Sequence, residues 1–169
     1  MSAAALHSGD LRVELRPVRE TDREFLIAVY GSTREEELRP LSWSEEQKAA
    51  FIAMQFEAQQ KHWGEVYPEA SRDVVIVSGE PAGRLYVNRG EKEIRIVDIA
   101  VLSPFRNKGV GEGLLRSIFE EGDASGRPVT IHVERHNPAM SLYERLGFTM
   151  KEDKGVYLLM SRPPEGEGR

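Results

Sequence analysis

Residues 99–113 read IAVLSPFRNKGVGEG, so an apolar run passes directly into a segment punctuated by three glycines. Gly109, Gly111 and Gly113 let the backbone approach a ligand without a Cβ atom in the way. The apolar side chains that follow have the spacing of one helix face: Leu114, Leu115, Ile118 and Phe119. The stretch therefore predicts a buried strand, a glycine turn and the start of an amphipathic helix.

The start of that helix is a candidate anion site. Its first N–H groups lack partners inside the helix, and the helix dipole adds partial positive charge there. These donors suit a phosphate or pyrophosphate, and Arg106 and Lys108 add positive charge beside them. Neither the Gly-x-Gly-x-x-Gly spacing of a dinucleotide site nor the Gly-Lys-Ser/Thr of a nucleotide P-loop is present. A plain strand-to-helix loop is the alternative interpretation.

The rest of the chain alternates strand-like and helix-like segments. Strand patterns occupy residues 11–18, 73–78, 83–88, 94–102, 129–134, 148–150 and 156–160. Helix patterns run from the caps Thr21 and Asp22 to Tyr30, onward from Ser44, from the glycine segment, and from Pro138 to Leu146. This order predicts one α/β (α+β) domain over residues 1–169, with flexible tails at 1–10 and 162–169. We expect a central mixed, mostly antiparallel sheet of six to seven strands, flanked by about four helices, with the strand at 94–102 buried on both faces.

The composition excludes several classes of function. A net charge of -5 with scattered Lys and Arg argues against nucleic acid or an anionic membrane as a partner. The absence of cysteine excludes disulfides, thiolate metal sites and a thiol nucleophile. The four histidines lack metal-ligand spacing, so we expect no metal. No signal peptide or membrane-spanning run is expected, which favours a cytoplasmic location.

A second motif reads NPAMSLYERLGF at residues 137–148. Together with Arg106-x-x-Gly109-x-Gly111 and its preceding strand, it resembles the two signatures of the GNAT superfamily of acetyl-CoA-dependent N-acetyltransferases. The two motifs occur in the family's order, with a strand between them. The resemblance covers roughly residues 73–160, whereas the first seventy residues are similar only in the order of their elements.

The resemblance implies a binding mode for acetyl-CoA. The fourth and fifth strands, here 94–102 and 129–134, would splay apart around the pantetheine arm. Backbone groups of Ile99 and Val101 would face that arm, with Asn137 and Met140 as further contacts. The pyrophosphate would be held by consecutive residues of the glycine segment: Arg106, Asn107, Lys108, Gly109, Val110, Gly111, Glu112 and Gly113.

The resemblance also places the hydroxyl of Tyr143 near the thioester sulfur, where it would donate a proton to the leaving thiolate. Without the motif, Tyr143 is interpreted as a packing residue of its helix, and Asn137 as a helix cap before Pro138.

The residues that would bind the amine and remove its proton are less distinct. Asp98 lies in an apolar strand and is a candidate general base, a substrate anchor or a hydrogen-bonded structural group. Glu37, Tyr86 and Glu134 are candidates for the acceptor site. Their alternative interpretations are a solvated helix face for Glu37, cross-strand packing for Tyr86 and a solvated strand position for Glu134.

The sequence therefore predicts an N-acetyltransferase that moves an acetyl group from acetyl-CoA to a primary amine by direct attack. The acidic run at 35–37 favours a small-molecule amine, and a protein amine is the other acceptor. An acyl-CoA-binding sensor without turnover is the alternative function. A nicotinamide oxidoreductase does not fit the glycine spacing. Membership of the family would also make a homodimer an expected assembly.

Overall fold

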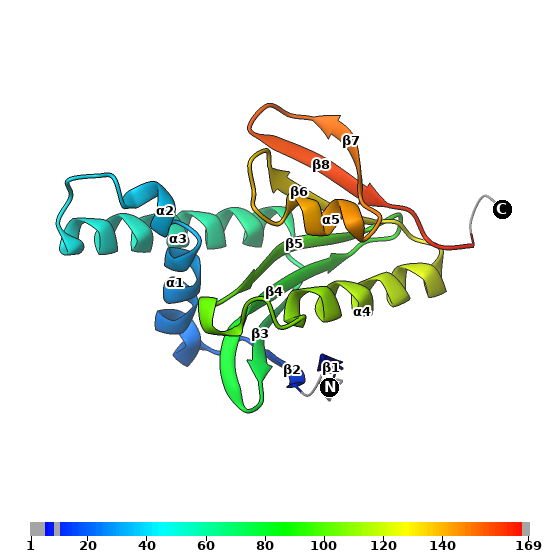
Figure 1. Cartoon of the computed structure of the whole chain (residues 1–169), viewed down its shortest axis with the longest axis horizontal. Helices are drawn as coiled ribbons and strands as arrows, with labels where there is room; N and C mark the ends of the chain where they lie inside the picture. Colours follow the sequence, from blue (N-terminus) through cyan, green and yellow to red (C-terminus); the bar gives the residue numbers. More distant parts are fainter. Residues whose placement is uncertain (1–5, 9–10, 167–169) are drawn as a thin grey trace.

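The computed structural model describes residues 6–8 and 11–166, which form one mixed sheet with helices on both faces (Figure 1). Within these residues the sheet has eight strands, in the order β1-β2-β3-β4-β5-β6-β8-β7. The strands are β1 (Leu6–Ser8), β2 (Leu11–Pro17), β3 (Ser71–Val77), β4 (Glu80–Arg89), β5 (Ile94–Val101), β6 (Val129–Glu134), β7 (Thr149–Asp153) and β8 (Tyr157–Arg162). Neighbouring strands are antiparallel except β5 and β6, which run parallel. The expected mixed, mostly antiparallel sheet is confirmed.

The sheet has one strand more than expected because Leu6–Ser8, within the predicted N-terminal tail, pairs with β2. Three residues are too few for a periodic pattern to be recognised. At the other end, Arg162 belongs to β8 and is buried, and its Nη1 donates to Asp123 Oδ1 at 3.0 Å. The tail predictions for residues 1–5, 9–10 and 167–169 lie outside the described residues.

The helices of the described residues are α1 (Arg23–Ser32), α2 (Glu35–Leu38), α3 (Glu45–Val66), α4 (Val110–Ser125) and α5 (Met140–Arg145), with the 3-10 helices η1 (Glu20–Asp22) and η2 (Ser103–Phe105). The short α2 is the addition to the four expected. The capping box that begins α3 is confirmed, because Gln47 N donates to Ser44 Oγ at 3.1 Å and Ser44 N donates to Gln47 Oε1 at 2.8 Å. Across the described part of the chain, no helix has both the length and the apolar character of a membrane span.

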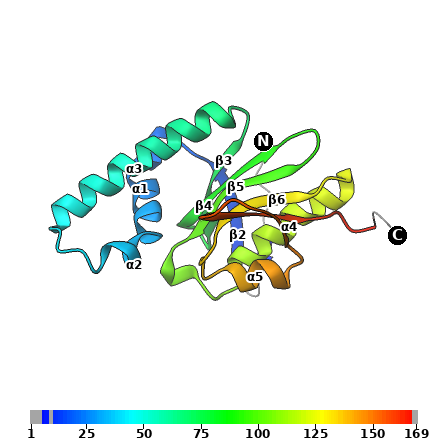
Figure 2. The same ribbon diagram turned by 90° about the horizontal axis from the view of Figure 1, so that it is seen from above.

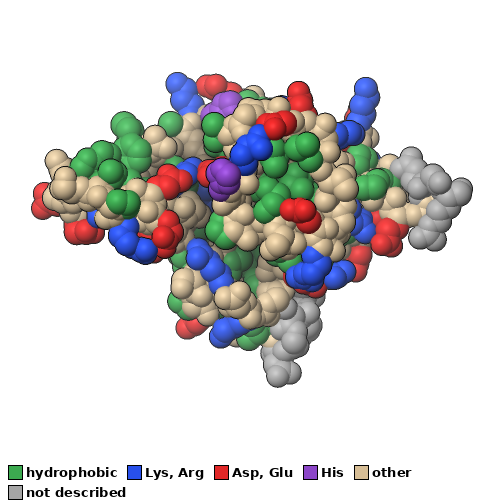
Figure 3. All heavy atoms as spheres, turned by 45° about the horizontal axis from the view of Figure 1, so that its top comes forward, with side chains coloured by type: hydrophobic (Ala, Val, Ile, Leu, Met, Phe, Trp, Pro, Cys, Tyr) green, Lys and Arg blue, Asp and Glu red, His purple; other side chains and the backbone are tan. Residues whose placement is uncertain are grey.

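Two apolar clusters hold these elements together. The larger one lies between the sheet and the helices α4 and α5, and the smaller one lies between α1 and α3. Seen from above, α3 and α4 cover opposite faces of the sheet (Figure 2). Acidic and basic side chains are interspersed over the face drawn in Figure 3, so that face carries no large area of single sign.

The two parallel strands at the centre of the sheet separate partway along their length. Strand β5 pairs with β6 only from Ile94 to Ile96, although it continues to pair with β4 as far as Val101. Residues 97–101 therefore have one flank without a strand partner, which confirms the expected splay. The expectation that this strand is buried on both faces is wrong for its second half, because Ile94 and Ile96 are buried whereas residues 97–101 are half-exposed. The open flank accounts for that exposure.

Candidate active site

Strand β5 carries one extra residue, Val97, at the point where its pairing with β6 ends. Asp98 and Ile96 pair with consecutive residues of β4, so Val97 is bulged out of the ladder. A bulge shifts the alternation of side chains by one residue. Ile96 and Ile99 consequently both contact the α4 cluster, while Asp98 faces the opposite side of the sheet and contacts Arg84.

Asp98 is bound by a buried arginine. Arg84 Nε donates to Asp98 Oδ2 at 2.6 Å, and Arg84 Nη2 donates to Gln59 Oε1 at 2.9 Å. The Arg84 side chain is 1% exposed and that of Asp98 is 25% exposed. Three aromatic rings lie 5.4–5.8 Å from the guanidinium carbon: Tyr30, Trp63 and Tyr86. Of the roles open to Asp98 from the sequence, this geometry favours the hydrogen-bonded structural group, since one carboxylate oxygen is already occupied.

Tyr143, on α5, lies in the apolar cluster on the other side of the sheet. It is 6% exposed, and its ring packs edge-to-face on Phe148 at 5.8 Å between centroids. Burial raises the pKa of Tyr143 to about 12, and the charge of Asp98 adds to the rise. Tyr143 is therefore protonated throughout the neutral range. Within residues 6–8 and 11–166, its hydroxyl makes no hydrogen bond, so the proton is available to a ligand.

The raised pKa makes a prediction for stability at alkaline pH. Below about pH 10 the phenol is protonated in both the folded and the unfolded chain. Between about pH 10 and the folded pKa of about 12, only the unfolded chain ionises, so folding loses stability as the pH rises. We expect wild type to lose about 1 kcal/mol more than Tyr143→Phe between pH 7 and pH 11, measured by urea unfolding. Equal losses would mean that Tyr143 ionises normally.

The glycine turn leads from η2 into α4. Asn107 and Gly109 have positive φ angles of 60° and 80°, and Gly109 is the N-cap of α4. Such angles are the reason for a glycine at 109, since other L-residues adopt them rarely. The first intrahelical bond runs from Gly113 N to Gly109 O, so within the described residues the N–H groups of residues 110–112 have no partner at the helix start. The turn therefore presents the expected backbone donors.

The side chains of Arg106 and Glu112 around this turn are held by hydrogen bonds and ion pairs within the protein. Arg106 Nε donates to Val101 O at 2.7 Å, which joins the turn to the end of β5. Glu112 contacts Arg116 and Arg145, each at 3.0 Å, and these hydrogen bonds hold its pKa below the usual range. The carboxylate of Glu112 is thus neutralised by neighbours, and only its backbone N–H is suited to an anion. Lys108 also lies in the turn, between Asn107 and Gly109.

The segment between β6 and α5 is shaped by Asn137. Its Oδ1 accepts from Ala139 N at 2.8 Å, and its carbonyl accepts from Met140 N at 3.0 Å. The N-cap of α5 is Ala139, so Asn137 caps the turn before α5 rather than the helix itself, and its amide NH₂ group is the donor left for a ligand. Met140, at the start of α5, packs against the large cluster together with Ile99 and Val101 of β5.

The two glutamates expected near the acceptor are brought together by an arginine. Arg34 Nη1 lies 2.7 Å from Glu37 Oε1 and 3.2 Å from Glu134 Oε1. Burial acts to lower the pKa of Arg34, but its hydrogen bond to the Tyr30 hydroxyl and the two carboxylates outweigh that effect and raise it. Across the described ranges, no group of three or more His, Asp and Glu side chains is arranged to hold a metal ion.

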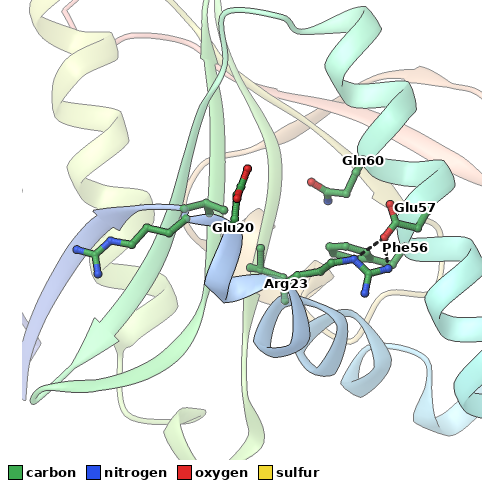
Figure 4. A pocket seen from close by; sticks show the side chains of 8 residues that line it. Glu20, Arg23, Phe56, Glu57 and Gln60 are labelled. Atoms are coloured by element: carbon green, nitrogen blue, oxygen red, sulfur yellow. Dashed lines mark hydrogen bonds and ion pairs between the residues drawn. The ribbon is translucent and has the colours of Figure 1, made fainter.

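A pocket of about 360 Å³ opens between η1, α1 and α3 (Figure 4). Arg23 of α1 forms an ion pair with Glu57 of α3 at one side, and Gln60 of α3 directs its amide into the space (Figure 4). Gln60 Oε1 accepts from the hydroxyl of Tyr86 at 3.4 Å. Tyr86 itself is buried and packs edge-to-face on Trp63, so it lies beneath this pocket rather than on its rim.

Sequence reasoning overlooked four polar residues: Gln59, Gln60 and Arg84, which contact one another or Tyr86 between α3 and the sheet, and Arg34, the N-cap of α2. A signal existed for Arg84, because a carboxylate in an apolar strand requires a partner and Arg84 is the cation of the neighbouring strand. The glutamines gave no such signal, since a polar face on a long helix normally indicates solvent.

The sheet opens between the parallel strands β5 and β6. The glycine turn follows β5, and the helix that carries the buried Tyr143 follows β6. This arrangement is typical of acyltransferases that use acyl-CoA. The chain belongs to the acetyltransferase (GNAT) family, whose model matches residues 31–148. The members of this family are described as acetyltransferases.

Two curated relatives match parts of the chain. Mycothiol acetyltransferase of Corynebacterium glutamicum is 40% identical over 68 residues, or 39% of this chain and 23% of that protein. A probable N-acetyltransferase named san, of Drosophila melanogaster, is 27% identical over 93 residues, or 53% of this chain and 50% of that protein. The chain thus spans at most about half the length of these relatives.

Solved structures share the fold at low identity. The PaiA N-acetyltransferase of Thermoplasma acidophilum, solved in complex with coenzyme A, has a TM-score of 0.67 at 17% identity, covering 89% of this chain and 98% of that one. An acetyltransferase of Thermus thermophilus has a TM-score of 0.65 at 21% identity, covering 89% and 96%. These likenesses extend the family's fold to the first helices, which the sequence motifs do not reach.

Proposed function

We propose that this chain transfers the acetyl group of acetyl-CoA to a primary amine by direct attack in a ternary complex. The observation that carries the proposal is Tyr143, whose buried hydroxyl is protonated at neutral pH beside a gap in the sheet. A neutral amine attacks the thioester carbonyl, so that a carbon–nitrogen bond forms and the carbon–sulfur bond breaks. Tyr143 would donate its proton to the departing sulfur, and water would take the proton that the amine loses.

Acetyl-CoA fits the residues on both sides of the gap. The free flank of residues 97–101 would offer backbone groups to the pantetheine arm, as in an added strand, apart from Val101 O, which accepts from Arg106 Nε. The N–H groups of residues 110–112 would bind the pyrophosphate. Gly111 supports this assignment, because its φ is not positive and a Cβ there would meet no atom within 4 Å. Glycine weakens a helix, and no contact within the described residues requires one at position 111. The close approach of a ligand would account for it.

Gly111→Ala should therefore change stability and binding in opposite directions. We expect the free energy of unfolding to rise by about 0.5–1 kcal/mol, because alanine favours the helix and the position is open. Affinity for acetyl-CoA should fall by about tenfold or more, since the methyl group would keep the pyrophosphate from the backbone donors. Urea unfolding and isothermal titration measure the two effects.

The control is Gly64→Ala in α3, where a Cβ would meet Arg72 Nη2 at an ordinary 3.6 Å. It should stabilise the helix similarly and leave acetyl-CoA binding unchanged. If Gly111→Ala binds acetyl-CoA as wild type does, the pyrophosphate is not held at this helix start.

The pairing of the acidic run bears on the class of acceptor. The acidic run at 35–37 is largely paired, Glu36 with Arg39 at 2.9 Å and Glu37 with Arg34 at 2.7 Å. It therefore offers a cationic small molecule less free charge than the sequence suggests, and protein amines stand beside small-molecule amines as acceptors.

The experiment that tests the proposed function is acetyl-CoA turnover against polyamines, aminoglycosides, amino acids and peptides, followed by release of free thiol. Thiol release with at least one amine class is the expected result. Binding of acetyl-CoA without release across the panel would favour the acyl-CoA sensor instead. Failure to bind acetyl-CoA would contradict both functions.

A further inference from the structure

Two buried hydrogen-bond donors in the described part of the chain have no acceptor: Gln60 Nε2 and Arg84 Nη1. Buried polar groups in folded proteins are nearly always paired, so each unpaired group requires an explanation. Both atoms are N–H donors, and Arg84 is 1% exposed. What is missing at both positions is an oxygen that accepts hydrogen bonds.

The two donors belong to one polar layer between α3 and the sheet. Arg84 and Tyr86 are two apart on β4, so their side chains lie on the same face. Arg84 Nη2 donates to Gln59, and the hydroxyl of Tyr86 donates to Gln60. The consecutive glutamines thus hold both strand residues, and Gln60 also lines the open pocket between α1 and α3 (Figure 4). A ligand in that pocket would reach the layer through Gln60, since Arg84 does not line the pocket.

The layer adjoins the gap in the sheet. Arg84 is bonded to Asp98, the residue directly after the Val97 bulge, where β6 departs from β5. Asp98 is close enough to Tyr143 for its charge to act on the phenol. The unpaired donors therefore lie on the α3 side of the sheet, beside the gap in which the proposed function places the pantetheine arm.

The charges of this region select the kind of oxygen. Arg84 is paired with Asp98, and Arg34 is shared by Glu37 and Glu134. Arg72 lies opposite Tyr86 on β3 with its guanidinium against α3, so three guanidinium groups accompany three carboxylates and the charges of the region balance. A carboxylate ligand would leave a buried negative charge without a partner, whereas an uncharged carbonyl oxygen keeps the charges balanced.

We propose that the polar layer binds an amide carbonyl of the acceptor, with Arg84 and Gln60 donating to its oxygen atoms. The acceptor would then be an amine that carries an amide, such as an amino acid amide or the amino terminus of a peptide. This inference rests on the proposed function, because it takes the acceptor amine to enter from the α3 side.

The test compares matched acceptors in sets of three: an amino acid amide, the free amino acid, and the amine left when the carboxyl group is removed. Leucinamide, leucine and isoamylamine form one such set. We expect kcat/KM for the amide to exceed that of either partner by roughly tenfold, the value of a hydrogen bond from a charged donor. Stabilisation of the protein against heat by each acceptor, with CoA present, is read in parallel and does not depend on turnover.

Gln60→Glu tests whether the preference for the amide arises from this layer. The substitution keeps an oxygen for the Tyr86 hydroxyl but replaces the unpaired N–H donor with a second acceptor. It should reduce the preference for the amide to less than about threefold. Gln55→Glu is the control, because it adds the same charge on α3, where Gln55 Oε1 accepts from Tyr30 at 3.2 Å. The control should retain the preference.

The outcomes separate the two proposals. Acetylation of all three acceptors at equal kcat/KM, unchanged by Gln60→Glu, would overturn the amide subsite and leave the acetyltransferase function intact. Selective stabilisation by the amide without thiol release would support the subsite and contradict the acetyltransferase function. Neither release nor selective stabilisation would overturn both.

Discussion

Tyr143→Phe should lower kcat by about 10²-fold or more, the contribution typical of a positioned acid catalyst. Phenylalanine retains the ring that packs on Phe148 and removes only the hydroxyl. That hydroxyl makes no hydrogen bond within the described residues, so its loss should not reduce the free energy of unfolding at neutral pH. KM for acetyl-CoA should change by no more than a few-fold. Initial rates of thiol release at saturating acetyl-CoA measure the effect.

The control is Tyr157→Phe, which alters a tyrosine of β8 that is 44% exposed and should leave kcat unchanged. An unaltered kcat in Tyr143→Phe would mean that the leaving thiolate takes its proton elsewhere. A lower kcat with a large loss of stability would instead indicate that Tyr143 acts through packing.

Asp98→Ala should lower the free energy of unfolding by about 3 kcal/mol, because it removes the carboxylate of a buried guanidinium. Arg84 is 1% exposed and would keep its charge without the partner at 2.6 Å. A matched control exists in Glu121→Ala, which breaks an ion pair with Arg89 at the same 2.6 Å but with side chains 37% and 40% exposed. The exposed pair should contribute less than about 1 kcal/mol. Equal losses in urea unfolding would show that burial of Arg84 does not determine the cost.

Asp98→Asn separates stability from chemistry. Asparagine can still accept from Arg84 Nε, so the stability loss should be smaller than with alanine. We expect kcat to fall by less than about tenfold, because Asp98 holds Arg84 rather than removing the proton of the amine. A fall of about 10²-fold in kcat with stability retained would instead assign Asp98 the role of general base.

Much of the fold could be predicted from the sequence, because it depends on interactions between residues that are close along the chain. The helix that begins after Ser44, the turn at Gly109 and the stop at Gly147 each depend on side chains or φ angles within a few residues. The strands were recognisable by alternation or by apolar, β-branched runs, apart from β1, which is too short to show a pattern. The acetyl-CoA side of the candidate site could be predicted for the same reason, because a glycine turn before a helix is a local feature.

For the side of the site that would bind the amine, the sequence indicated only candidate residues. Glu37 and Glu134 are far apart in sequence, and Arg34 joins them in space. Tyr86 was correctly noted as a residue that could pack, yet its partners Trp63 and Gln60 lie on a helix whose packing face the sequence did not reveal. Such contacts depend on how α3 crosses the sheet.

The sequence by itself determined the family, the order of the elements and the residues of the glycine turn, because each depends on neighbours along the chain. Only the tertiary structure decided which way Asp98 points and what it contacts. Alternation along β5 would direct Asp98 to the same face as Ile96, and the Val97 bulge turns it to Arg84 instead. That bulge arises where β5 keeps its pairing with β4 while β6 departs, a balance between strands distant in sequence.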